Sequence, residues 1–281
     1  MPILHEFRQK PPASMFGDGS DGDVVVMASL VATREMYFRD LTVDPGATVD
    51  GLWKIHCSRK LVNYGTIGIS TVGGNGTSFS QGSVPPATYG HNVYTAGNGG
   101  QNGANGFNAG GGSVSLTFDA TKGKGGAGGS AGAFTGGTGN AMSAVTGLWA
   151  TYGNRATSGQ LSTLFRGSYS YNYAGCGGGG ASATTGDIGG GGGGRGGYVN
   201  IAARELINFG LIDAHGGNGA NGTGANAGGG GGGGGGHINI QAEIYRNFGT
   251  LNVSGGLGGL GVGSGGNGVD GSDGYIILNA S

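Results

Sequence analysis

The sequence predicts an all-β repeat protein with little or no α-helix, in which a β-rich, solenoid-like module precedes a glycine-rich region of packed polyglycine II helices. Three observations lead to this fold class. Glycine accounts for 74 of the 281 residues, and most of it lies in residues 73–281. The glycines recur in steps of three residues. A unit of strand, turn, short strand and glycine tract also occurs several times along the chain.

The three-residue period predicts the conformation of the glycine tracts. A polyproline II helix has three residues per turn and forms no internal hydrogen bonds, so its amides and carbonyls need partners on neighbouring segments. Because glycine lacks a Cβ, such helices can approach closely enough to bond to one another, and we hypothesise a packed lattice of them. A flexible linker is the alternative interpretation. The tracts with this spacing are residues 97–106, 123–132, 216–222 and 265–274.

A second pattern joins the glycine tracts to β-strands. An Asn-aromatic-Gly turn occurs three times between apolar residues, at 63–65, 208–210 and 247–249. A strand candidate precedes each turn, and paired glycines follow it. Internal periodicity of this kind is typical of a stacked solenoid, in which each unit buries its apolar face on the next. The first unit carries a long insertion between Asn63 and Asn208. The strand candidates are residues 52–57, 198–203 and 237–242.

Composition excludes several classes of protein. Only 10% of the residues are charged, against about 25% in typical proteins, and the net charge is −1, so the chain lacks the basic face that binds nucleic acid. No run of 18 apolar residues is present, so no membrane insertion is expected. The 6 prolines are too few for collagen, and Cys57 and Cys176 are too few for a disulfide framework.

The sequence contains no pattern of a catalytic or metal site. The 5 histidines lack the spacing of zinc ligands, and no nucleophile elbow stands between a strand and a helix. Matches to Gly-x-Gly-x-x-Gly are frequent only because glycine is abundant, and no confident helix follows them to complete a phosphate-binding loop. We therefore expect a protein that is not an enzyme and that has no cofactor and no metal.

The sequence Asp-Gly-Ser-Asp-Gly occurs twice, at residues 18–22 and 270–274, and each copy precedes an apolar strand. Aspartate carboxylates are ligands that Ca²⁺ accepts, although the bidentate glutamate of an EF-hand is absent. A tight turn that enters a strand explains the same residues. The sequence favours the turn over the calcium site.

These patterns divide the chain into three parts. Residues 1–16 form either a docking arm that orders on a partner or a disordered terminus, and they lack the features of a signal peptide. Residues 17–72 form a β-rich module, with strands expected at 37–43 and 53–57. Residues 73–281 form the glycine-rich polyglycine II domain.

Two insertion loops, residues 79–94 and 141–175, interrupt the glycine pattern and gather aromatic and arginine side chains. Such side chains dominate binding hot spots, and tyrosine with serine, glycine and asparagine is typical of recognition loops. The alternating residues 168–173 are equally consistent with a strand that packs an aromatic face on another protomer. The candidate receptor contacts are Tyr89, His91, Tyr94, Trp149, Tyr152, Arg155, Phe165, Arg166, Tyr169, Tyr171 and Tyr173.

The glycine tracts, joined by aromatic and Ser/Asn-rich loops, resemble the receptor-binding adhesins at the tail-fibre tips of T-even-type bacteriophages. This resemblance implies a sandwich of polyglycine II helices whose distal loops bind an outer-membrane protein or saccharide. Residues 17–43 are instead similar to glycine-rich phage structural proteins that begin with a β-solenoid, and the fibre-attachment domain of the T-even adhesins is not seen. The resemblance covers residues 73–274 and rests on residues 123–132, 177–180, 189–194 and 228–236.

We therefore expect a bacteriophage structural protein on the virion surface, a tail-fibre or surface adhesin that binds a host-cell receptor through its aromatic loops. The alternative is a capsid or tail decoration protein with a purely structural role. The expected partners are other virion proteins, through the N-terminal segment, and a host surface protein or saccharide, but no nucleic acid. A homotrimer is one candidate assembly. A cell-surface or matrix protein is a third hypothesis, which the missing secretion signal disfavours.

Overall fold

The computed structural model describes residues 3–7, 13–32, 34–50, 54–68, 127–131, 135–137, 143–144, 172–173, 187–194 and 196–280. These residues form fourteen β-strands and one short 3-10 helix, η1 (Ala13–Phe16), and contain no α-helix. The all-β prediction is confirmed for this part of the chain. Within it, no helix has the length and apolar character needed to cross a membrane.

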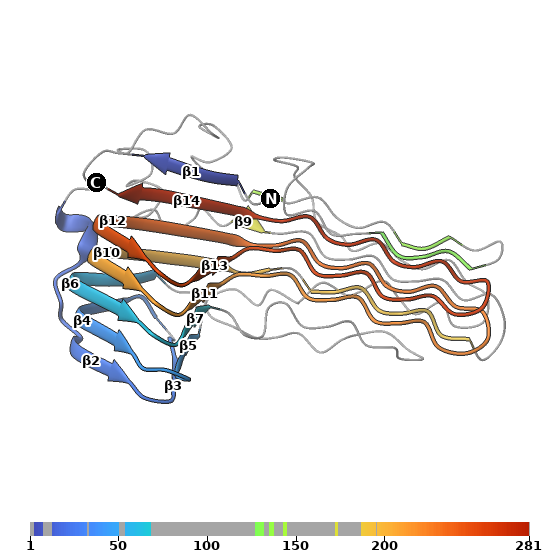
Figure 1. The fold of residues 1–281 in the computed structure, drawn as a ribbon, viewed down its shortest axis with the longest axis horizontal. Coiled ribbons are helices and arrows are strands. Elements are labelled where there is room, and N and C mark those ends of the chain that lie inside the picture. Colours follow the sequence, from blue (N-terminus) through green and yellow to red (C-terminus); the bar gives the residue numbers. More distant parts are fainter. Residues whose placement is uncertain are drawn as a thin grey trace.

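Seven parallel strands form the larger sheet (Figure 1). Alternating Ile, Val and Leu residues favour strands, and the alternation directs one set of side chains to each face. β6, β10 and β12 begin close to the strand candidates and run on through the apolar residues before each turn, so they are longer than predicted. Across the sheet the order is β1 (Ile3–Phe7), β14 (Tyr275–Ala280), β12 (His237–Asn247), β10 (Tyr198–Asn208), β6 (Lys54–Asn63), β4 (Met36–Val43) and β2 (Gly22–Val26).

Five shorter parallel strands form a second sheet. Each follows one of the long strands after a turn, so the chain passes from the larger sheet to the smaller one at every unit. The two-residue strands β8 (Ser143–Ala144) and β9 (Asn172–Tyr173) pair separately, in antiparallel orientation. The order in the smaller sheet is β13 (Thr250–Asn252), β11 (Leu211–Asp213), β7 (Thr66–Gly68), β5 (Thr48–Asp50) and β3 (Ser29–Val31).

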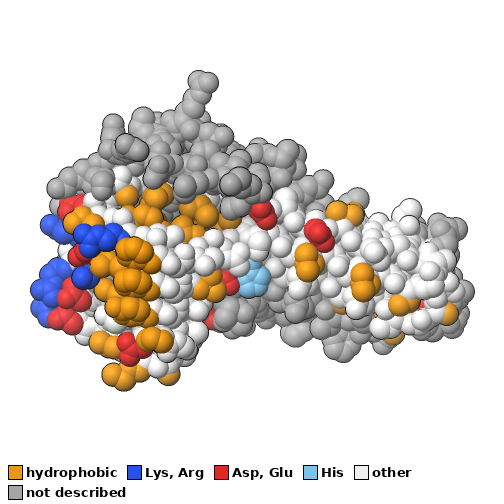
Figure 2. All heavy atoms as spheres, in the orientation of Figure 1, with side chains coloured by type: hydrophobic (Ala, Val, Ile, Leu, Met, Phe, Trp, Pro, Cys, Tyr) orange, Lys and Arg blue, Asp and Glu red, His pale blue; other side chains and the backbone are white. Residues whose placement is uncertain are grey.

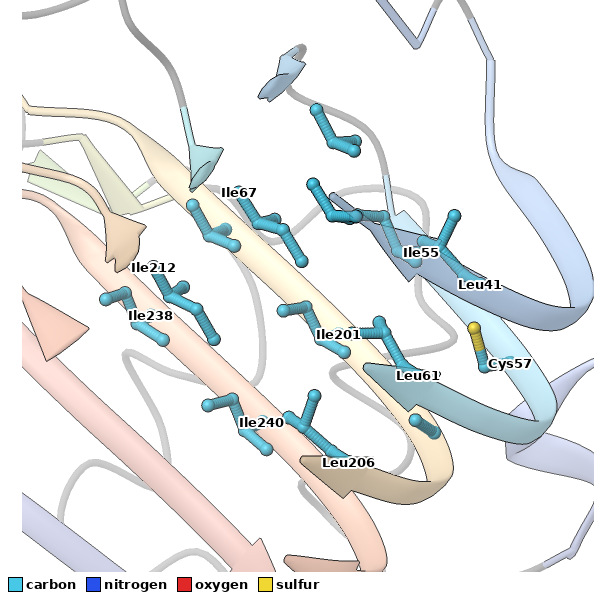
Figure 3. Packing of buried hydrophobic residues seen from close by; sticks show 14 of the residues in the cluster. Leu41, Ile55, Cys57, Leu61, Ile67, Ile201, Leu206, Ile212, Ile238 and Ile240 are labelled. Atoms are coloured by element: carbon cyan, nitrogen blue, oxygen red, sulfur yellow. The ribbon is translucent and has the colours of Figure 1, made fainter. Parts of the chain in front are cut away.

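The seven-stranded and five-stranded sheets together are here called the β-strand module, and its hydrophobic core lies between them. Leu61 and Leu206 from the larger sheet and Ile67 and Ile212 from the smaller one are at most 1% exposed and belong to one buried cluster (Figure 3). Burial of each such side chain contributes about 1.5–3 kcal/mol. Cys57 also belongs to this core, and burial raises the pKa of its thiol.

Extended glycine-rich segments connect the strands and run side by side away from the module (Figure 1). The second Asp-Gly-Ser-Asp-Gly sequence lies in one of them, and its predicted turn is wrong, because residues 266–274 are extended up to the start of β14. The first copy does form the predicted turn. There the Asp18 carboxylate accepts the amide of Ser20 over 2.9 Å, and the Gly22 amide donates to the Gly19 carbonyl over 2.9 Å.

Residues near the N-terminus contribute to the sheet and to its outer face. Strand β1 pairs in parallel with β14. Farther along, Met15 and Phe16 of η1 are 0% exposed and cluster with Ala202 of β10. The imidazole Nδ1–H of His56 donates to the Met15 carbonyl over 2.7 Å. This part of the chain thus lies across the larger sheet, on the face opposite the core.

Candidate functional site

Three asparagines line the turns between the long and the short strands. Asn63 Nδ2 donates to Asn208 Oδ1 over 2.7 Å, and Asn208 Nδ2 donates to Asn247 Oδ1 over 2.7 Å. Asn63 and Asn208 are 0% exposed. An unsatisfied buried amide costs about 1–3 kcal/mol, so these hydrogen bonds hold the three turns in one register. The ladder ends at Asn63 because Val43, its neighbour in register on β4, has no side-chain amide.

The glycine of each Asn-aromatic-Gly turn is required by close backbone contacts. A Cβ at Gly210 would lie 2.1 Å from the carbonyl oxygen of Gly65, and a Cβ at Gly249 would lie 2.0 Å from that of Gly210. Both separations are far below van der Waals contact. The glycines therefore permit successive turns to stack directly on one another.

The aromatic residues of these turns form an exposed stack, here called the aromatic column: Tyr64, Phe209 and Phe248. The ring centroids of Tyr64 and Phe209 are 5.0 Å apart and those of Phe209 and Phe248 are 5.1 Å apart, with interplanar angles of 4° and 14°. The three residues are 46%, 46% and 67% exposed. Figure 2 shows hydrophobic side chains gathered in a column over this edge of the module. The three rings therefore form one exposed apolar strip on the surface of the module.

A row of paired charges runs beside the column on the larger sheet. Arg39 Nε donates to Asp23 over 2.7 Å and Arg59 Nε to Asp40 over 3.1 Å, each across one strand pair. Farther along the row, Glu205 lies between two cations, with Lys60 Nζ at 3.7 Å and Arg246 at 3.6 Å. The hydrogen bond from Arg39 lowers the pKa of Asp23. The aromatic column is therefore bordered by paired charges on the larger sheet.

The glycine-rich segments, here called the glycine layer (residues 187–194, 196–197, 214–236 and 253–274), are joined by backbone hydrogen bonds. The central segment, 228–236, bonds to five other segments, and its partners in four of them repeat every third residue; in the fifth, the Gly129 amide donates to the Gly229 carbonyl over 2.8 Å. Amides of Gly229, Gly232 and Gly235 donate to Gly266, Val269 and Ser272, and those of Gly230, Gly233 and Gly236 donate to Ala220, Gly217 and Ala214. Carbonyls of Gly228, Gly231 and Gly234 accept from Gly190, Gly193 and Gly196, and those of Gly230 and Gly233 accept from Gly259 and Gly256.

Close backbone contacts leave no space for a side chain at many glycines of the layer. A Cβ at Gly233 would lie 1.9 Å from the Gly194 carbonyl oxygen, and one at Gly232 would lie 2.0 Å from that of Gly256. Each hydrogen bond makes a net contribution of about 0.5–1.5 kcal/mol to stability. The layer needs many of them because ordering glycine loses more backbone entropy than ordering any other residue.

Asparagine and aspartate side chains complete the hydrogen bonding at the margin of the layer. Asn218 and Asn221 accept the amides of Leu257 and Leu260, both over 2.8 Å. Asp270 accepts the amide of Gly258 over 2.7 Å. These residues take the place of a further glycine segment, since a side-chain oxygen satisfies an amide that no backbone carbonyl reaches.

The end of the layer farthest from the module is closed by two tight turns, residues 223–226 and 262–265. Gly224 and Gly263 adopt φ values of 103° and 58°, which favour glycine. Asp187 is buried and accepts the Ala225 amide over 2.6 Å, and Asn226 accepts the Ser264 amide over 3.0 Å. The far end of the described chain is therefore fixed by hydrogen bonds rather than by apolar packing.

A cluster of titratable side chains lies on the outer face of the larger sheet, beneath η1. The Tyr37 hydroxyl donates to Glu35 over 2.7 Å, and Lys54 Nζ lies 3.3 Å from the same carboxylate. The hydrogen bond to Glu35 raises the pKa of Tyr37 to about 12, and burial lowers the pKa of His56. Among the described residues, no group of three or more His, Cys, Asp or Glu is placed to hold a metal ion. Contact with η1 gives this cluster a role in fixing the N-terminal segment.

Of the receptor contacts expected from the sequence, one lies among the described residues: Tyr173 in β9, whose backbone pairs with Ser143. The aromatic column was missed as a surface, because the Asn-aromatic-Gly pattern was interpreted only as a turn. The recurrence of an aromatic residue at the same place in three units that stack on one another is the signal that could have found it. The expected contacts outside the described residues are Tyr89, His91, Tyr94, Trp149, Tyr152, Arg155, Phe165, Arg166, Tyr169 and Tyr171.

Comparison with known proteins identifies no relative: no family model, no curated protein and no solved structure matches the chain.

Proposed function

We propose that this protein is a surface appendage of a bacteriophage virion, an adhesin that holds host-binding loops away from the particle. In this proposal the strand units stack as a β-solenoid and the glycine layer is a lattice of polyglycine II helices. The observation that carries it is the three-residue repeat of hydrogen-bond partners along residues 228–236, which matches a helix with three residues per turn.

A lattice of this kind suits a spacer. Segment 228–236 bonds to five neighbours, so bending it would break several hydrogen bonds at once. A flexible glycine linker would instead let its two ends move independently. Figure 1 shows the glycine segments extending well beyond the β-strand module, so the layer separates the module from the far turns. The insertion loops at 79–94 and 141–175 are the proposed host contacts.

The adhesin proposal is tested by adsorption. Virions that carry the triple substitution Tyr169→Ala, Tyr171→Ala and Tyr173→Ala should assemble normally and lose attachment to the host cell. The control is Val269→Ala, which alters an exposed side chain of the glycine layer, 57% exposed, and should leave attachment intact. Normal attachment of the triple variant would contradict the adhesin role.

The second candidate, a decoration protein without a receptor, is favoured by the aromatic column, which suits packing on a neighbouring virion protein. Under this alternative, Phe209→Ser with Phe248→Ser should reduce incorporation of the protein into particles, while the tyrosine variant should adsorb normally. Quantifying the protein in purified particles and their adsorption separates the two functions.

A further inference from the structure

The β-strand module has one open end, formed by strand β2, the turn at Met27 and Ala28, and strand β3. Among the described residues, β2 pairs only with β4, and β3 pairs only with β5. One edge of each strand therefore has no described neighbour. An open edge of this kind accepts a further strand unless the protein protects it with lysine, proline or a bulge directed against pairing.

A bulge or irregularity interrupts the pairing of β2 with β4 between Gly22 and Asp23, but residues 24–26 beyond it pair in regular register, and this part of the open end presents apolar side chains. Val25, Met27 and Val31 are 53%, 77% and 50% exposed. Figure 2 shows hydrophobic side chains at this end of the module, where β2 and β3 lie in Figure 1. The exposed apolar area favours an occupant that buries it.

Backbone direction at this edge suits a second strand. The Val26 carbonyl accepts the Asp44 amide on the β4 side, over 2.9 Å. Because backbone groups of successive strand residues point to opposite edges, the N–H and C=O of Val25 point to the open side. In the same way the Ala28 carbonyl accepts the Thr48 amide, over 2.7 Å, which directs Ser29 outward.

The charges at the edge favour an identical strand. Asp23 is neutralised by Arg39, and Asp21 is paired with Arg34. Two copies of this edge therefore bring together apolar side chains and compensated carboxylates rather than two bare negative charges. Like charges directly opposite would destabilise a strand pair.

We propose that two copies of this chain associate through their β2 edges, as an antiparallel strand pair with Val25 of each copy on the two-fold axis. The larger sheets of the two copies then continue into one another. This association closes on itself, because a two-fold interface uses the same surface on both partners and leaves no edge for a third.

The full-length protein tests the proposal by its mass in solution. Sedimentation at micromolar concentration should give twice the 27.3 kDa mass of the chain for the parent protein. Val25→Asp should reduce it to the single-chain mass. The matched control is Val269→Asp, a substitution of a valine with 57% exposure on the glycine layer, which should leave the dimer intact.

A cross-link provides the second measurement, which does not depend on the charged variant. Antiparallel partners in a hydrogen-bonded pair have Cα atoms about 5.5 Å apart, within the range of a disulfide. Val25→Cys, in a Cys176→Ser background, should form a covalent dimer under mild oxidation, while buried Cys57 does not react. A single-chain mass for the parent protein, a dimer that survives Val25→Asp, or no cross-link at position 25 would each overturn the proposal.

Discussion

In the β-strand module, side chains fill the space between two sheets, whereas in the glycine layer the backbones themselves are in contact. Leu61, Leu206, Ile67 and Ile212 stabilise the module by burying apolar surface. The central segment of the layer, residues 228–236, contributes no side chain beyond hydrogen atoms, and its partners are amides and carbonyls of five other segments. A smaller side chain in the module should therefore cost stability through the cavity it leaves, and an added atom should cost most at the glycines of the layer that are in close backbone contact.

The largest expected effect is that of one methyl group in the layer. In Gly233→Ala the new Cβ would lie 1.9 Å from the Gly194 carbonyl oxygen, and the neighbouring backbones cannot separate without losing hydrogen bonds. We expect the substitution to lower the free energy of unfolding by about 4 kcal/mol or more, as severe packing defects do. Chemical denaturation followed by circular dichroism measures this change.

Gly266→Ala is the matched control, because the nearest atoms to its Cβ would be 3.6 Å away, an ordinary contact. It should change the free energy of unfolding by less than about 1 kcal/mol. Equal effects of the two alanines would show that the layer is not held by close backbone contact.

A core substitution in the module is expected to have the next largest effect. Leu206→Ala removes a side chain that is 0% exposed and leaves a cavity between β10 and its neighbours. Such changes cost about 2–5 kcal/mol, and the value depends on how far the surroundings relax. Leu257→Ala, at a leucine with 62% exposure on the layer, is the control and should have little effect in the same denaturation experiment.

The asparagine ladder is expected to be worth less than a core leucine. Asn208→Ala removes the acceptor of Asn63 and the donor to Asn247, and leaves a buried Asn63 amide with fewer partners. We expect a loss of about 1–3 kcal/mol in unfolding free energy. Asn221→Ala, which removes an acceptor at the exposed margin of the layer, should cost about 1 kcal/mol or less. A larger effect at Asn221 than at Asn208 would contradict this account of the ladder.

The smallest expected effect is a pH dependence at the junction of module and layer. The Asp213 carboxylate lies 2.7 Å from His215 Nδ1 and raises the pKa of that imidazole above its usual value. The pair therefore stabilises the fold fully below the imidazole pKa of the unfolded chain, and this stabilisation is lost as pH rises through the higher folded pKa. Since His215 is partly exposed, only a few tenths of a kcal/mol are expected.

NMR titration of the His215 imidazole checks the direction of this shift. Its pKa should fall in Asp213→Asn, and the stability difference between the parent protein and His215→Gln should shrink between pH 5 and 8. An imidazole pKa that is unchanged by Asp213→Asn would exclude the pairing as its cause.

The sequence predicted the strands well because their signal is local. The alternation of Ile238, Ile240 and Ala242 with polar residues and the turn at Asn247 depend only on neighbours in the chain, and they locate β12 and the turn after it. Glycine spacing also indicated which residues require close contact. The second Asp-Gly-Ser-Asp-Gly copy was misinterpreted because the acceptor role of Asp270 toward Gly258 depends on a segment twelve residues away.

The aromatic column and the open edge of β2 could not be predicted from the sequence for a similar reason. Phe209 belongs to a surface because the turns that carry Tyr64 and Phe248 stack on either side of it, and a single turn does not reveal this. Likewise, the open edge at Val25 follows from the order of strands across the sheet, in which β2 is the last. The sequence order does not determine this arrangement, because β1, although first in the chain, pairs with β14 at the other side.

Amide hydrogen exchange tests the central claim, that backbone contact makes the glycine layer a rigid unit. The amides of Gly229, Gly232, Gly233 and Gly236 each have a backbone acceptor on another segment. They should be protected to the same degree as the amides of β10 and β12, since all of them open only with the surrounding structure. Exchange of the glycine amides at the rate of an unstructured peptide, while β10 stays protected, would contradict the account.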